Sequence, residues 1–166
     1  GYILAGRTWS NDGDVTGNHG EDDFWVVKLD NSGTLQWQKC LGGSGGEGAK
    51  CIVQTADEGY LVTGATQSSD GNLSDIKGGF DYWVVKLNST GSIEWQNTYG
   101  TENYEYSAYI KQTADDGYIL LGNSSNYGIL DYIDNDIVLY KLDSSGNILW
   151  QKNYGGSRID LGLDIE

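Results

Sequence analysis

The chain has no methionine, no proline, a single histidine and only two cysteines among its 166 residues. The lone His19 cannot build a histidine metal cluster, and it argues against a Ser-His-Asp triad within this chain. Cys40 and Cys51 are too few for a disulfide framework, so we expect two unpaired thiols. Translation normally starts with methionine, so its absence predicts a processed product or a part of a longer protein. This favours an extracellular or cell-surface location.

Basic residues are also scarce, with 10 Lys and Arg against 24 Asp and Glu, a net charge of −14 and a pI near 4.1. Nucleic acids and anionic membranes attract basic patches, so neither is an expected partner. No apolar run reaches the roughly 20 residues that cross a bilayer, so no membrane insertion is expected. Cations and basic protein surfaces remain compatible with this charge.

What the sequence does contain is one pattern repeated three times. The segments GYILAG, GYLVTG and GYILLG begin 58 residues apart, at Gly1, Gly59 and Gly117. The segments GTLQW, GSIEW and GNILW keep nearly the same spacing and end at Trp37, Trp95 and Trp150. A period of this length is typical of one four-stranded β-propeller blade, a unit that cannot bury its own faces alone.

Each unit contains four short runs of β-branched, aromatic and aliphatic residues, which predict strands. In the second unit the runs are Ala49–Thr55, Tyr60–Thr66, Tyr82–Asn88 and Ile93–Tyr99. The connections 56–59 and 88–91 both end in glycine, which predicts hairpins with Gly59 and Gly91 in the left-handed region. The third run is apolar on both faces, as in a sheet that is covered on both sides. No long segment has a helical apolar period, so helices should be nearly absent.

We therefore predict an all-β chain of β-propeller blades, each a four-stranded antiparallel meander. Residues 1–41 form a blade without its first strand, 49–99 and 107–154 form complete blades, and 161–166 form the first strand of a next blade. Three blades are fewer than the four that usually close a ring, so the segment is an open part of a larger propeller. Additional blades of the same chain, or a second copy joined head to tail, would cover its exposed faces.

The repeat, read in the third unit as QTADDGYILLG, then DxxxxKLDxxGxIxW, then YGG, resembles the propeller-like repeats of secreted and cell-surface proteins of bacteria and archaea. Such repeats often stand beside adhesive modules. The resemblance spans the whole chain and implies a non-catalytic extracellular role in binding, adhesion or scaffolding. A weaker likeness to the tryptophan-docking repeats of quinoprotein dehydrogenases rests on Asp30, Gly33 and Trp37, which are one residue more closely spaced here.

The loops between the second and third strands, and those that cross between blades, should share one end of the molecule, where propellers usually bind ligands. Fifteen of the 24 acidic residues lie in these loops, so this end should be negative. The oxygen-rich loops contain five candidate calcium ligands: Asp12, Asp14, Thr16, Asp70 and Asn72. The alternative is a solvated turn in which Asp and Asn cap their own backbone.

Acidic residues also recur at fixed places in the repeat. One set stands at the start of the third strand of each unit: Asp23, Asp81 and Asp136. The other set follows the crossing between blades: Glu47, Glu105 and Asp160. Repetition within one chain predicts a structural duty for them. The expected function is therefore a binding or scaffolding module with protein or glycan contacts. The alternatives are an extracellular polysaccharide hydrolase or lyase that uses loop carboxylates, and a purely structural spacer.

Overall fold

The four runs of each repeat form antiparallel meanders in the computed structural model, which describes residues 1–74, 76–125 and 135–166. The first sheet contains β1 (Tyr2–Thr8), β2 (Asp23–Leu29) and β3 (Leu35–Leu41). The second contains β4 (Glu47–Gln54), β5 (Tyr60–Thr66), β6 (Asp81–Leu87) and β7 (Ile93–Tyr99). The third contains β8 (Tyr104–Gln112), β9 (Tyr118–Ser125), β10 (Asn135–Leu142) and β11 (Ile148–Tyr154). The described residues contain no helix, which confirms the all-β prediction.

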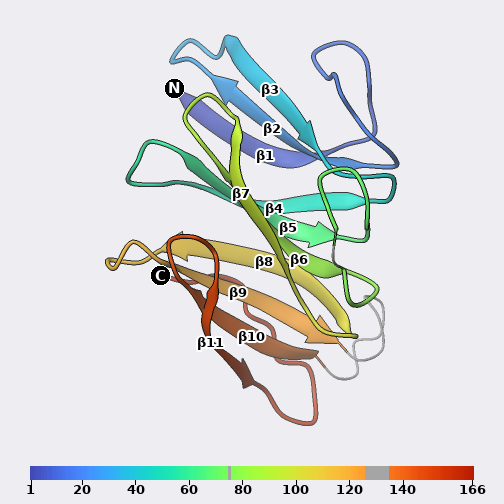
Figure 1. Cartoon of the computed structure of the whole chain (residues 1–166), viewed down its shortest axis with the longest axis vertical. Helices are drawn as coiled ribbons and strands as arrows, with labels where there is room; N and C mark the ends of the chain where they lie inside the picture. Colours follow the sequence, from blue (N-terminus) through green and yellow to red (C-terminus); the bar gives the residue numbers. More distant parts are fainter. Residues whose placement is uncertain (75, 126–134) are drawn as a thin grey trace.

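The three sheets are stacked along the long axis of the molecule (Figure 1). The first strand of each complete sheet packs on the sheet before it, because β4 contacts β1 and β8 contacts both β5 and β4. This arrangement of open sheets is consistent with consecutive β-propeller blades. Residues 161–166 have no strand partner within the described chain and form no strand.

Apolar residues fill the two spaces between the three sheets. The core between the first and second sheets includes Phe24, Val62 and Trp83, and the Phe24 and Trp83 ring centroids are 4.6 Å apart. The core between the second and third sheets includes Tyr82, Leu120 and Tyr140. Every residue of β6 is buried, as the two-sided apolar pattern predicted, whereas every residue of β11 is exposed.

The turns 88–91 and 56–59 place different residues in the left-handed region. Gly91 has a φ of 81°, and Asn88 Oδ1 accepts hydrogen bonds from the backbone of Thr90 and Ser92, as predicted for 88–91. In the 56–59 turn the prediction was wrong, because Glu58 occupies the left-handed region with a φ of 66°. Gly59 is needed there for space, since a Cβ on it would lie within 3.0 Å of Lys86 Nζ and Leu87 O.

Candidate functional site

The loops at one end of the second sheet are tied to the crossing that enters it. The Ser44 N–H donates to Asp70 Oδ1 at 2.7 Å, and the Gly45 N–H donates to Ser68 Oγ at 2.8 Å. The Asn72 and Gly42 backbones are also joined, by a bond from Asn72 N to Gly42 O at 3.2 Å. These bonds fix the loop 67–74 against the crossing. The hydrogen bonds from Ser44 also lower the pKa of Asp70.

The candidate calcium residues lie in two separate loops. Asp12 and Asp14 are exposed in a turn where the Val15 N–H donates to Asp12 O at 3.1 Å. Thr16 accepts a hydrogen bond at Oγ1 from Gln38 Nε2 at 2.7 Å. Asp70 and Asn72 face the crossing described above. Within the described ranges, no three His, Cys, Asp or Glu side chains come together to hold a metal ion. Calcium binding stays a prediction from the sequence.

Acidic side chains from neighbouring sheets meet beneath the first two crossings. A Cβ on Gly42 would lie under 3.0 Å from both Asp23 Oδ1 and Glu47 Oε2, and a Cβ on Gly100 would lie equally close to Asp81 Oδ1 and Glu105 Oε2. All four carboxylates are buried, with exposures of 0% to 1%. The repeated acids are therefore built into the junctions between sheets, and only glycine leaves room above each pair.

Hydrogen bonds reach some of the carboxylate oxygens in each pair. Glu47 Oε1 accepts from Thr66 Oγ1 and Ser68 Oγ, and Glu47 Oε2 accepts from the Gly43 N–H. The equivalent Glu105 Oε1 accepts from Thr101 and Ser124, whereas its Oε2 has no partner among the residues that the structure describes. Burial raises the pKa of Glu105, and the nearby Asp81 carboxylate raises it further. Burial likewise raises the pKa of Asp81.

Burial of these pairs changes the expected charge of the loop end. The exposed acids there include Asp12, Asp14, Glu21, Asp70 and Glu102. The acids of the two described pairs are withdrawn from the surface, and Asp22 is also buried. Asp75, Asp131 and Asp134, which belong to the predicted acidic set, lie outside the described residues. The His19 side chain contacts one of these buried acids, with its Nδ1 2.6 Å from Asp23 Oδ2.

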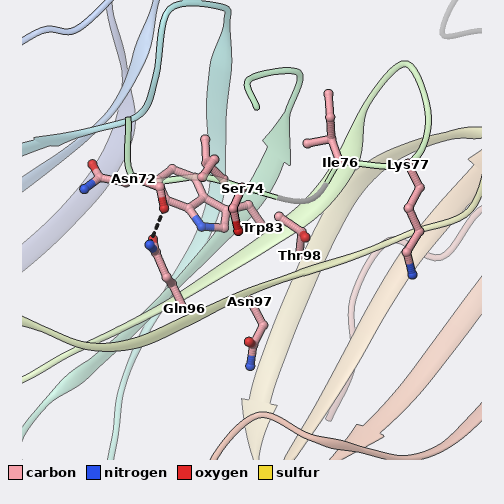
Figure 2. A pocket seen from close by; sticks show the side chains of 9 residues that line it. Asn72, Ser74, Ile76, Lys77, Trp83, Gln96, Asn97 and Thr98 are labelled. Atoms are coloured by element: carbon pink, nitrogen blue, oxygen red, sulfur yellow. Dashed lines mark hydrogen bonds between the residues drawn. The ribbon is translucent and has the colours of Figure 1, made fainter. Parts of the chain in front are cut away.

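A pocket of about 640 Å³ opens between residues 72–74, 76 and 77 on one side and the outer strand β7 on the other. Its lining is rich in amides and hydroxyls, with Trp83 and two aliphatic side chains: Asn72, Leu73, Ser74, Ile76, Lys77, Trp83, Gln96, Asn97 and Thr98. Figure 2 shows Gln96 reaching from β7 to the backbone of Asn72, beside the Trp83 ring, with Lys77 further along the loop. No His, Cys, Asp or Glu occurs among these described lining residues.

The polar atoms at the base of this pocket differ from their equivalents in the first sheet. There, Trp25 Nε1 donates to Gln38 Oε1 at 3.0 Å, so the indole and the amide satisfy each other. The corresponding Trp83 Nε1 and Gln96 Oε1 are both buried and have no hydrogen-bond partner within the described structure. Buried polar groups are normally paired, so this donor and acceptor distinguish the second sheet from the first.

The two-sided apolar pattern predicted burial for the run Tyr82–Asn88, which contains Trp83, and nothing in the sequence analysis singled out Gln96. The structure confirms burial of Trp83, whose exposure is 0%, and adds that it lines the pocket. A usable signal was present, because tryptophan is followed by glutamine 13 residues later in both Trp25–Gln38 and Trp83–Gln96. That spacing joins the third and fourth strands of one unit across a hairpin, as Val27 pairs with Gln38 and Val85 with Gln96.

The two cysteines are unpaired, as predicted. Burial raises the pKa of the Cys40 thiol to about 11, with a further contribution from Asp23. The thiol is therefore protonated at neutral pH and is a poor nucleophile.

Comparison of the chain with protein-family models and with curated proteins gives no match. In the described ranges there is no helix of the length and apolar character required to cross a membrane.

Proposed function

We propose that this chain is a non-catalytic, propeller-type binding module whose loop end takes a hydroxyl-rich ligand, of the glycan class, in the pocket that Trp83 and Gln96 line. The observation that carries this proposal is the unpartnered pair of Trp83 Nε1 and Gln96 Oε1. A hydroxyl group can accept from the indole N–H and donate to the amide oxygen at once. Saccharides supply such groups in arrays, and amide and indole side chains are suited to bind them.

A hydrogen bond from Gln96 Nε2 to Asn72 O joins β7 to the loop that covers this pocket (Figure 2). Trp83 has no exposed surface beneath the loop. We therefore expect ligand entry to displace residues 72–74 and to exchange this bond for bonds to the ligand. Entry through a displaced loop predicts slow association relative to an open site.

The position of the carboxylates supports binding over hydrolysis. A glycosidase needs two carboxyl groups that flank an accessible glycosidic bond. Asp23, Glu47, Asp81 and Glu105 are instead buried beneath glycine crossings, in equivalent pairs. Carboxylates withdrawn from solvent in this way are not placed to flank a bound glycosidic bond.

The test is titration of the chain with neutral gluco-, manno- and N-acetylglucosamine oligosaccharides, followed by amide NMR shifts. We expect shifts in residues 72–77 and β7 with at least one saccharide series. Gln96→Leu should weaken that affinity about tenfold, because it removes a buried hydrogen bond. The matched change Gln38→Leu, in the first sheet, should leave the affinity unchanged.

Two results would contradict this function. If none of the saccharides shifts these residues, or if Gln38→Leu and Gln96→Leu weaken binding equally, the pocket is not the binding site. If shorter saccharides appeared during the titration, the chain would be a hydrolase and not a binding module.

A further inference from the structure

A second pocket, of about 570 Å³, lies where the hairpin turns of the second and third sheets meet. These turns are at the opposite end of the sheets from the loop 67–74 (Figure 1). Among its described lining residues are the carboxylates of Asp57, Glu94 and Asp116 and a single ammonium group, that of Lys86. With three negative charges against one positive charge, the pocket attracts cations.

The ammonium group of Lys86 has no hydrogen left to offer a ligand. Its side chain is only 3% exposed, and Nζ donates to Asp57 Oδ2 and to Glu94 Oε2, both at 2.8 Å. The third donation goes to Leu87 O at 3.3 Å, and an ammonium group has three donors. The side chains of Asp57 and Glu94 are 58% and 44% exposed, so both carboxylates also face outward.

The charge of Glu94 is more than the repeat needs. In the third sheet the equivalent Lys141 finds three acceptors with one carboxylate alone, together with a hydroxyl and a backbone carbonyl. The residue in the position of Glu94 is Gln36 in the first repeat and Leu149 in the third. The second repeat therefore carries an additional carboxylate that satisfying the lysine does not require.

Tyr118 is an independent feature of the same pocket. It is 3% exposed, and its ring centroid lies 5.8 Å from that of Trp95. Both residues line the pocket, and the Tyr118 hydroxyl makes no hydrogen bond with the residues that the structure describes. Burial raises the pKa of this hydroxyl, the Lys86 ammonium opposes the rise, and the three carboxylates add to it. The hydroxyl thus lies among the charged groups without a partner, although buried polar groups are normally paired.

We infer that this pocket takes the guanidinium group of an arginine side chain from a basic peptide segment of a partner protein. A guanidinium group has five donors and no acceptor, which suits the carboxylates of Glu94 and Asp116 and the Tyr118 hydroxyl. It also packs well on an aromatic ring, and Trp95 lines the pocket. The net charge of −14 favours the approach of a basic segment. This site is separate from the proposed glycan pocket and does not depend on it.

The test is titration of the chain with an acetylated Gly-Arg-Gly amide, followed by amide NMR shifts. The control is the same peptide with citrulline, which has nearly the same shape as arginine and no charge. We expect shifts at residues 56–57, 94–95 and 116–118 with the arginine peptide, and at least tenfold weaker binding of the citrulline peptide. N-acetylarginine amide is the probe for a free guanidinium compound and should bind more weakly than the peptide.

Three variants locate the contact. Glu94→Gln introduces the residue that the first repeat has at this position, and it should weaken binding of the arginine peptide about tenfold, because a charged hydrogen bond is lost. Tyr118→Phe keeps the ring and removes the hydroxyl, and it should weaken binding about fivefold. The matched control is Glu102→Gln, which removes the same charge from an exposed position near the other end of the sheets and should leave the affinity unchanged.

Four results would overturn the inference. Equal binding of the arginine and citrulline peptides would exclude recognition of the charge, and equal weakening by Glu94→Gln and Glu102→Gln would reduce it to attraction by the net charge. Absence of shifts at these residues with the arginine peptide would exclude the site. An affinity for N-acetylarginine amide equal to that for the peptide would exclude a peptide partner in favour of a small guanidinium compound.

Discussion

The covered junctions and the open face of this molecule have nearly the same sequence and very different surroundings. Trp95 packs against Tyr118 and Gly146, whereas Trp150, in the same place one repeat later, is exposed. The strands show the same contrast, since β7 is mostly part-buried and β11 is exposed throughout. The comparison teaches that a repeat defines a surface for its neighbour, and that the neighbour decides whether this surface becomes core.

The largest expected effect comes from removing the aromatic anchor of a covered junction. Trp95→Ala should lower the free energy of unfolding by about 3 kcal/mol, because it leaves a cavity against Tyr118. Trp150→Ala should lower it by less than about 1 kcal/mol in a dilute monomeric sample, since an exposed side chain leaves no cavity. Urea unfolding of both variants measures the difference. Equal losses would show that the two tryptophans have the same environment.

A smaller effect is expected where glycine makes room for a carboxylate pair. Gly100→Ala should destabilise the chain by about 2 kcal/mol, because its Cβ would press on both Asp81 and Glu105. The comparison is Gly156→Ala at the third crossing, where the nearest atom to an added Cβ is Asp160 Oδ2 at 3.8 Å. Thermal unfolding should separate the two variants. A neutral Gly100→Ala would mean that the crossing moves freely above the pair.

The smallest effect concerns the charge of the buried Asp81–Glu105 pair. The pKa of Glu105 is raised, chiefly by burial, so the folded chain keeps a proton that the unfolded chain has lost. Stability therefore falls as the pH rises from the unfolded-state pKa of Glu105 through its folded value. Glu105→Gln remains uncharged and keeps an acceptor for Thr101 and Ser124. It should flatten this slope and raise stability at neutral pH by about 1 kcal/mol.

The check is the free energy of unfolding of both chains between acidic and neutral pH. Asp160→Asn serves as the comparison at the third crossing, where the carboxylate is only partly buried and accepts from the Gly156 N–H. It should change the stability at neutral pH less than Glu105→Gln does. If Glu105→Gln is less stable than the parent chain at every pH, the pair is stabilised by its charge and the assignment of the shift is wrong.

Much of the fold could be predicted because its information is local and repeated. The strand β5 and the strand β7 have the predicted bounds, and β6 is displaced by one residue. Alternating apolar residues and turn glycines report directly on strands and hairpins. The turn at 56–59 could not be predicted in the same way, because the space around Gly59 is occupied by Lys86 of another hairpin.

The site was less accessible to sequence reasoning. Repetition singled out the acids at the crossings, four of which are buried in the structure, but it gave no reason for two equivalent tryptophans to differ. The indole N–H of Trp25 donates to Gln38, and that of Trp83 has no partner among the described residues, although the spacing is the same. That difference depends on the loop that covers each pair, and loop paths are set by contacts between distant segments.

The sequence by itself determined the strands, the hairpins and the period that stacks three sheets, because backbone geometry and apolar alternation act over a few residues. Only the tertiary structure decided which carboxylates are withdrawn from water, which indole lacks a partner and which aromatic residues are left exposed. Those properties depend on what lies across a junction, and a sheet meets its neighbour through residues far away in the chain.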